Sequence, residues 1–156
     1  MTDSQPRRVL FVCTHNSARS QMAEGMLRAW ASDRFEAYSA GTEVSTVRPE
    51  AIAAMAEIGI DIGGHRSKSV DEYLGQKFEW VITVCDQARQ NCPIFPGVEQ
   101  TGHWSVQDPS EATGDEEQRL EVFRRVRDDL RNRIHVFILA ASRDDLPAPE
   151  ISLVNE

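Results

Sequence analysis

The sequence lacks any long run of apolar residues. No run approaches the roughly 20 residues that a helix needs to cross a bilayer. The first residues, Met1 to Pro6, also contain no apolar core of the kind found in secretory signals. We therefore expect a cytoplasmic protein without a membrane partner.

Positive charge is in short supply as well. The 156 residues carry 17 Lys and Arg against 25 Asp and Glu, which gives a formal net charge of −8. Such an excess of acid argues against nucleic acid or an anionic membrane as a partner. An anionic substrate would have to be attracted by a local field, because the field of the whole protein repels it.

Cysteine is rare, and this excludes a fold held together by disulfides. The three cysteines, Cys13, Cys85 and Cys92, are odd in number, and the chain is long enough to form a core without cross-links. The thiols are therefore expected to serve chemistry. Internal repeats and low-complexity tracts are also missing, so we expect one domain over residues 1–142, a tail over residues 143–156, and a monomer.

Apolar periodicity and turn residues predict strands that alternate with helices. This alternation favours a parallel sheet with helices on both faces, and in such folds the chemistry lies at the carboxyl ends of the strands. Cys13 and Cys85 each follow a strand directly, so both are expected at one edge of the sheet. The predicted strands are 8–13, 35–41, 80–84 and, with weaker support, 98–104; the predicted helices are 19–32, from Pro49 to a C-cap at Gly59, 69–74, and a long one that starts at a capping box of Asp115 and Gln118.

The most informative stretch runs from Val9 to Ser20. Four apolar residues predict a buried strand, and Cys13 then opens a loop that leads into a helix at Arg19. The unpaired N–H groups and the dipole of a helix N-terminus favour an anion, either a thiolate or a bound oxyanion. Arg19 can donate two hydrogen bonds to such an anion. We therefore predict that Cys13 is a nucleophile.

The pattern Cys-x5-Arg-Ser after an N-terminal strand resembles the phosphate-binding loop of low-molecular-weight protein tyrosine phosphatases. It equally resembles the loop of the arsenate reductases that share their fold. The resemblance implies a flavodoxin-like three-layer α/β fold with a central four-stranded parallel sheet. It also implies that Ser20 donates a hydrogen bond to the Cys13 thiolate, although Ser20 is also placed to cap the helix. The implied oxyanion-binding loop comprises Thr14, His15, Asn16, Ser17, Ala18 and Arg19, in which Asn16 shapes the backbone and His15 is expected to be exposed.

The segment from Cys85 to Cys92 carries the other two thiols. If it is helical, the two Cα atoms lie about 10 Å apart, whereas a disulfide requires roughly 4.4–6.8 Å. The pair can close only if the helix unwinds, with Pro93 as a natural boundary. Two unrelated cysteines remain an alternative. A zinc site with His65 or His103 is disfavoured, because the spacing does not match the usual Cys-x2–4-Cys pattern.

The three cysteines together with Asp108-Pro109 resemble the thioredoxin-coupled arsenate reductases, over about residues 9–138. Phosphatases of this fold share the first loop and an Asp-Pro, but not the Cys-x6-Cys pair. They also usually carry tyrosine beside that Asp-Pro, where this chain has Ser110.

The resemblance implies a mechanism made of successive thiolate displacements. Cys13 attacks arsenate that is held by the loop amides and Arg19, and Asp108 acts as general acid. Cys85 then attacks Cys13 and releases arsenite, and Cys92 attacks Cys85 and carries the disulfide to the surface. Thioredoxin, or glutaredoxin with glutathione, would reset the enzyme. Because the electrons come from thiols, neither a metal nor a nicotinamide cofactor is expected in this chain.

A second likeness concerns a cation site. Asn16, Glu24 and Ser39 match positions that bind potassium in some of these reductases, but the expected acidic ligand is replaced by Lys68. Either the Lys68 ammonium takes the place of the cation beside Glu24, or Lys68 is a solvated lysine.

Two other functions compete with arsenate reduction. One is a phosphatase for phosphotyrosine or small phosphoesters, in which Cys85 and Cys92 give redox protection. The other is a non-enzymatic sensor of oxyanions or redox state, which is disfavoured because a nucleophile, an arginine and an acid are all present. The arginines of the last helix are expected on its solvent face: Arg124, Arg125, Arg127, Arg131 and Arg133.

Overall fold

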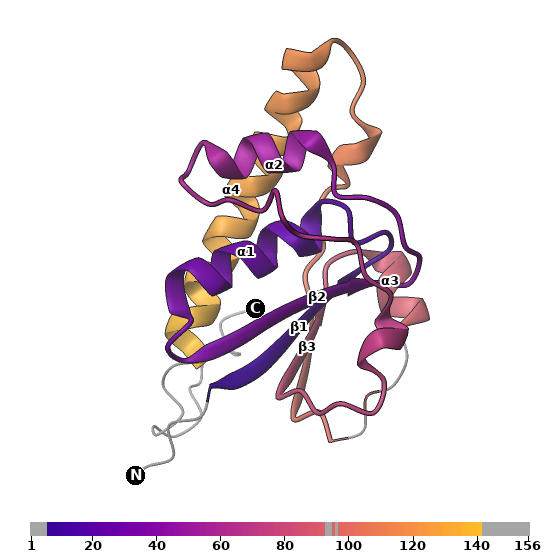
Figure 1. Ribbon diagram of the computed structural model, residues 1–156, viewed down its shortest axis with the longest axis vertical. Coiled ribbons are helices and arrows are strands. Elements are labelled where there is room, and N and C mark those ends of the chain that lie inside the picture. Colours follow the sequence, from indigo (N-terminus) through magenta and orange to yellow (C-terminus); the bar gives the residue numbers. More distant parts are fainter. Residues whose placement is uncertain (1–5, 93–94, 96, 142–156) are drawn as a thin grey trace, which may run out of the picture.

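A computed structural model describes residues 6–92, 95 and 97–141. The expectations for the first five residues, for Pro93 and for the tail lie outside these residues. Four parallel strands form one sheet, as predicted, and their order in the sheet is β2-β1-β3-β4 (Figure 1). The elements are β1 (Arg7–Cys13), α1 (Arg19–Ala31), β2 (Phe35–Gly41), α2 (Pro49–Ala56), the 3-10 helix η1 (Val70–Tyr73), β3 (Trp80–Thr83), α3 (Asp86–Asn91), β4 (Gln100–His103), the 3-10 helix η2 (Pro109–Glu111) and α4 (Glu116–Ala141).

Strand β1 lies inside the sheet and pairs with β2 on one side and with β3 on the other. Its residues from Val9 to Val12 are fully buried. An unbroken apolar run is what a strand needs when both faces of its sheet are covered. The central position of β1 places Cys13, its last residue, in the middle of the carboxyl edge.

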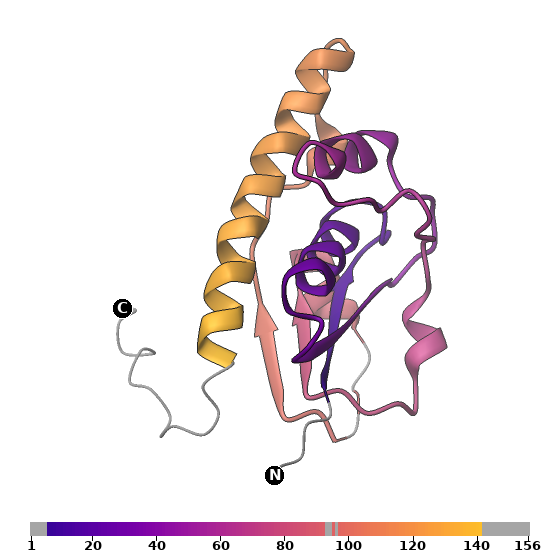
Figure 2. The ribbon, with the colours of Figure 1, turned by 60° about the vertical axis from the view of Figure 1, so that its left-hand side comes forward.

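Alternate residues of the strands face two different layers. On one face, Phe137 of α4 packs on Phe35 and Trp80, and α1 lies against α4 through Trp30 and His135. In Figure 2 the long helix α4 runs along the sheet and its N-terminal part extends beyond it. On the opposite face an aromatic cluster is formed by Tyr38 with Tyr73, Phe78 and Phe95.

Helix α4 begins as the sequence predicts. The backbone N–H of Asp115 donates to Gln118 Oε1, and the backbone N–H of Gln118 donates to Asp115 Oδ1, both at 2.8 Å. These reciprocal bonds satisfy donors that a helix start leaves unpaired, so the predicted capping box is confirmed.

The prediction for Arg127 is wrong. Its side chain is buried, and Nη1 donates to the carbonyl of Ala54 and to Glu57 Oε1 at 2.9 and 2.8 Å. These acceptors lie at the end of α2, where the helix dipole favours a cation. Arg124 also binds Glu57 through its guanidinium. Arg124 and Arg127 therefore belong to the contact between α2 and α4 and do not simply face solvent.

Several element boundaries differ slightly from the expectations. Helix α2 ends at Ala56, and Gly59 follows three residues later with a positive φ of 82°. The predicted helix at 69–74 is a 3-10 turn from Val70 to Tyr73, and the fourth strand is shorter than expected. Within residues 6–92, 95 and 97–141, no helix has the length and apolar character that crossing a membrane requires.

Gly41 is the last residue of β2, and the backbone of the loop after Cys13 passes close to its Cα atom. This close approach leads to a first prediction. A Cβ atom at Gly41 would lie 2.7 Å from the carbonyl oxygen of Thr14 and 2.8 Å from the amide of Asn16. Backbone atoms cannot yield as a flexible side chain does, so Gly41→Ala should lower the free energy of unfolding by about 1–3 kcal/mol, as measured by urea denaturation.

The matched control is Gly64→Ala, because no described atom lies within 4 Å of a Cβ at that exposed glycine. This change should stay within about 0.5 kcal/mol of the parent protein. Equal denaturation midpoints for the two variants would show that the close approach at Gly41 is not a constraint.

Candidate active site

The candidate site lies where β1 and β3 end. Cys13 is the last residue of β1, and the loop of residues 14–18 leads from it to Arg19, the first residue of α1 (Figure 1). The backbone N–H of Val84 donates to the carbonyl of Val12, so the chain beyond β3 continues beside β1. This pairing brings Cys85 to the same edge as Cys13.

The Cys13 sulfur lies among hydrogen-bond donors. Its Sγ atom is 2.8 Å from Ser20 Oγ and accepts a bond from the backbone N–H of Asn16 at 3.2 Å. Cys13 as a whole residue is 2% exposed. Ala18, the residue before α1, offers no side-chain acceptor to the first amides of the helix. Such an arrangement favours negative charge at the sulfur and at the helix start.

Arg19 borders a pocket of about 320 Å³ that Cys85, Ser105, Val106 and Gln107 also line. Its Nη1 donates to the carbonyl of Val106 at 3.0 Å, and its Nη2 lies 3.7 Å from Asp108 Oδ2. The segment that contains Val106 and Asp108 thus holds the Arg19 guanidinium in place. The lining of the pocket therefore includes both a cationic residue and a cysteine.

Asp108 is fixed by Ser110, whose backbone N–H and hydroxyl both donate to Oδ1, at 3.0 and 2.7 Å. Burial raises the pKa of the Asp108 carboxyl. The hydrogen bonds from Ser110 and the charges of Arg19 and His15 outweigh that effect, so the pKa lies below its usual value. Asp108 is therefore ionised at neutral pH and must take up a proton before it can donate one. His15 is exposed, with Nε2 lying 3.2 Å from Glu43 Oε1.

Cys85 is buried at the start of α3. Its Sγ lies 3.2 Å from Thr14 Oγ1 in the candidate oxyanion loop, and it accepts a bond from the backbone N–H of Ala88 at 3.4 Å. Cys85 therefore contacts the loop of Cys13 and caps α3 at the same time.

Cys92 follows the other end of α3 and is half-buried, and all three cysteines are free thiols. Burial raises the pKa of Cys92 to about 11, which keeps it protonated at neutral pH. The predicted helix between the two cysteines is present as Asp86–Asn91. The structure thus has Cys92 in a form that does not act as a nucleophile.

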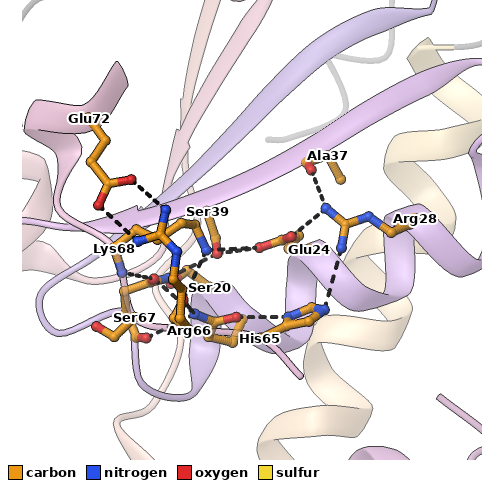
Figure 3. A network of polar contacts seen from close by, with 12 residues as sticks. Ser20, Glu24, Arg28, Ala37, Ser39, His65, Arg66, Ser67, Lys68 and Glu72 are labelled. Carbon is orange, nitrogen blue, oxygen red and sulfur yellow. Dashed lines mark hydrogen bonds and ion pairs between the residues drawn. The ribbon is translucent and has the colours of Figure 1, made fainter. Parts of the chain in front are cut away.

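Behind the loop lies a buried polar network that contains the cation-like positions (Figure 3). The Glu24 carboxylate accepts bonds from Ser39 Oγ and Arg28 Nη2, both at 2.5 Å, and Lys68 Nζ lies 3.7 Å from Glu24 Oε1. Lys68 also donates to the carbonyl of Arg66 at 3.0 Å. Burial lowers the pKa of Lys68, and the Glu24 carboxylate opposes that shift. Lys68 is therefore a buried lysine beside Glu24, and not a solvated one.

Asn16 joins this network to the nucleophile. Its Nδ2 donates to Ser20 Oγ at 2.7 Å and to Ser39 Oγ at 2.9 Å, and its Oδ1 accepts from the backbone N–H of Lys68 at 2.8 Å. Asn16 has a φ of 53°, in the left-handed region that asparagine tolerates better than most residues. The predicted cation-like residues and the loop therefore form one cluster.

Gln21 and His65 belong to this cluster, and sequence reasoning missed the role of Gln21. Its side chain is fully buried and contacts both Asn16 and His65. A polar residue in the first turn of a helix usually faces solvent, so no signal in the sequence marks it. His103, the other histidine of the alternative zinc site, bonds to Thr83 Oγ1. Within the described residues, no three His, Cys, Asp or Glu side chains come together as a metal site.

Comparison with known proteins places this geometry in context. Residues 8–146 match the family model described as low molecular weight phosphotyrosine protein phosphatase. A protein named arsenate reductase from Halalkalibacterium halodurans is 45% identical over 129 residues, which are 83% of this chain and 93% of that protein.

Solved structures give the same picture. A structure titled as an arsenate reductase in the oxidised state superposes with a TM-score of 0.73 at 35% identity, covering 85% of this chain and 97% of that one. A low molecular weight protein tyrosine phosphatase from T. tengcongensis superposes with a TM-score of 0.70 at 29% identity, covering 85% and 98%. Sequence and structure thus match proteins with both of the activities that the loop alone leaves open.

The burial of Cys92 generates a prediction about its reactivity. In the variant Cys13→Ser/Cys85→Ser, Cys92 is the only thiol, and its alkylation by iodoacetamide should accelerate with pH towards a midpoint at about 11, because only the thiolate reacts. Mass spectrometry of the alkylated protein measures the rate at each pH.

The control is the same variant in urea, where the midpoint should fall to about 8.5, the value of an unperturbed cysteine. A native midpoint that equals the urea value would mean that Cys92 is not protected by burial.

Proposed function

The chain belongs to the low molecular weight phosphotyrosine protein phosphatase family, and we propose that within this family it is an arsenate reductase whose three cysteines reduce arsenate to arsenite. The observation that carries the proposal is the position of Cys85. Its sulfur lies 3.2 Å from Thr14 Oγ1 in the loop that begins at Cys13. Phosphoester hydrolysis uses a single thiol, whereas arsenate reduction requires a second one within reach of the first.

In the first step the Cys13 thiolate forms a sulfur–arsenic bond with arsenate, and one arsenic–oxygen bond breaks. The leaving oxygen departs as water after it takes up a proton. Asp108 supplies this proton to the leaving hydroxyl, having first accepted one from a second hydroxyl of dihydrogen arsenate or from the Cys13 thiol, since its pKa is low in the free protein. Arg19 and the amides at the start of α1 hold the remaining oxygens. Arsenic is still pentavalent after this step.

In the second step Cys85 attacks the Cys13 sulfur. A sulfur–sulfur bond forms, the sulfur–arsenic bond breaks, and its electron pair stays on arsenic, which leaves as trivalent arsenite. Two thiols have then lost two electrons and arsenic has gained two. A disulfide between Cys13 and Cys85 would form in a buried place, because the two residues are 2% and 7% exposed as free thiols.

In the third step Cys92 attacks Cys85 and regenerates the Cys13 thiolate. Helix α3 separates the two cysteines, so it must unwind before the bond can form. Unwinding also exposes Cys92, and its pKa then falls from about 11 towards the ordinary value of a cysteine. Cys92 thus becomes reactive only when α3 opens.

The proposed mechanism needs an external thiol reductant, and we assign this role to thioredoxin, with glutaredoxin and glutathione as the alternative. A dithiol protein supplies both electrons that return the Cys85–Cys92 disulfide to thiols. We further propose that the protein acts as a monomer in the cytoplasm, the compartment that keeps such thiols reduced.

We also propose that the Lys68 ammonium replaces a bound potassium ion. Three observations support this: the burial of Lys68, its 3.7 Å distance from Glu24, and the link from Ser39 to Asn16. A cation bound beside Glu24 would have to compete with a positive charge that is already part of the chain.

The relay predicts a sharp phenotype for Cys92→Ala. With thioredoxin, thioredoxin reductase and NADPH, this variant should release at most one arsenite per molecule and then stop, because Cys13 and Cys85 are both buried and the reductant could not reach a disulfide between them. Loss of NADPH absorbance after arsenate addition measures turnover.

The matched control is Gln90→Ala, an exposed position on the same helix, which should keep steady turnover. Full steady turnover by Cys92→Ala would disprove the relay. Rapid hydrolysis of p-nitrophenyl phosphate together with no consumption of NADPH on arsenate would instead identify a phosphatase.

The cation proposal predicts that potassium does not activate the enzyme. Arsenate reduction in potassium chloride and in tetramethylammonium chloride of equal ionic strength should agree within about twofold, since screening is held constant. Lys68→Asp restores an acidic ligand and should make the rate depend on potassium.

Lys77→Asp is the control, because it makes the same charge change at an exposed lysine outside the network. Strong activation of the parent enzyme by potassium would remove the proposal for Lys68.

A further inference from the structure

We propose that Gln21 is a positioning residue for the nucleophile: its side-chain amide holds Asn16 in the left-handed conformation and completes a chain of hydrogen bonds from His65 to the Cys13 sulfur. The proposal deepens the proposed function and rests on the role of Cys13 as nucleophile.

The contacts of Gln21 fix the orientation of its amide. Nε2 lies 2.8 Å from Asn16 Oδ1, 3.2 Å from the Asn16 carbonyl oxygen and 2.8 Å from the Arg66 carbonyl oxygen. All three atoms are acceptors, so the donating end of the amide must point at them. Two contacts to the same asparagine, one on its backbone and one on its side chain, clamp it. A non-glycine residue with a positive φ persists only where its surroundings impose it.

The other end of the amide needs a donor, and His65 provides it. Its Nδ1 lies 2.9 Å from Gln21 Oε1, while its Nε2 lies 3.4 Å from Arg28 Nη1, a group that can only donate. These partners select the neutral ring with its proton on Nδ1. Burial lowers the pKa of His65. The charges of Glu24 and Asp61 oppose that effect, and those of Arg28 and Lys68 add to it. The ring thus stays neutral at neutral pH.

Every bond of the chain then runs in one direction. His65 donates to Gln21, Gln21 donates to Asn16 Oδ1, and Asn16 Nδ2 donates to Ser20 Oγ at 2.7 Å. Because Ser20 Oγ already accepts that bond, its own proton is free for Cys13 Sγ at 2.8 Å. Hydrogen bonds that point the same way polarise one another, and here the last acceptor is the sulfur. The chain therefore favours a thiolate at Cys13.

The test measures the reactivity of Cys13 without arsenate. In a Cys85→Ser/Cys92→Ser background Cys13 is the only thiol, and its alkylation by iodoacetamide is followed by mass spectrometry over a series of pH values. Gln21→Met keeps the length of the side chain but removes the amide. At the acidic end of the series, where the rate follows the thiolate fraction, it should slow alkylation about tenfold, the effect of weakening one charge-assisted hydrogen bond. Gln76→Met, a half-buried glutamine that bonds to Arg8, is the control and should leave the rate unchanged.

The direction of the change separates positioning from mere structural support. If Gln21 only supported the fold, its loss would expose the buried sulfur and alkylation would become faster. An unchanged or faster rate in Gln21→Met therefore overturns the proposal.

If Gln21→Met does not fold, His65→Leu tests the same chain of hydrogen bonds at a half-buried position. This variant should also slow alkylation. An unchanged or faster rate would overturn the proposal in this case too. The assay measures alkylation by iodoacetamide and contains no arsenate. If the protein proves unable to reduce arsenate, the proposed function fails, but the result for Gln21 can still be interpreted.

Discussion

A buried sulfur that acts as a thiolate, as proposed for Cys13 at the end of β1, must be surrounded by donors, and much of the local structure meets that requirement. The loop after Cys13 turns through a left-handed residue, which brings a backbone N–H to the sulfur, and the start of α1 is left without a side-chain cap. Gly41 allows the neighbouring strand to pass close to that loop. The polar cluster behind the loop occupies a buried region, where polar side chains cost desolvation free energy unless they are hydrogen-bonded. We infer that the cluster serves to hold Asn16 and the loop in place.

Charge in the site works against the charge of the whole chain. The protein carries a net charge of −8, so Arg19 and the amides of α1 must attract an oxyanion locally. Arg19 also lies 3.7 Å from the ionised Asp108. An incoming anion would compete with Asp108 for this guanidinium and add negative charge beside it. Both effects raise the affinity of Asp108 for a proton. Binding of the substrate thus prepares the acid that the first step requires.

Local patterns in the sequence predict much of the fold, because strands, loop and capping box are set by residues close together in the chain. Cys13, Arg19 and Ser20 form a motif within eight residues, and the structure brings Ser20 to the sulfur as expected. The prediction for Arg127 was wrong and the role of Gln21 was missed for the opposite reason. Arg127 bonds to Ala54 and Gln21 bonds to Arg66, and both of these partners lie far away along the chain. Nothing in a helical periodicity tells a buried, fully bonded polar side chain from a solvated one.

The double role of Cys85 links the proposed chemistry to the opening of α3. Its sulfur accepts the backbone N–H of Ala88 and so caps a helix of six residues. Helices of this length are marginal without support. Loss of an oxygen N-cap such as Ser or Asp costs about 0.5–2 kcal/mol, and a sulfur cap, which is a weaker acceptor, lies at the low end of that range. In the proposed second step Cys85 attacks as a thiolate, and the disulfide sulfur that it becomes is a poorer hydrogen-bond acceptor than that thiolate. When Cys85 becomes bonded to Cys13 the cap weakens, and α3 loses stability at the moment when Cys92 must reach Cys85. The proposed relay therefore requires no separate signal to unwind the helix, because the product of its second step weakens the interaction that keeps the third thiol away.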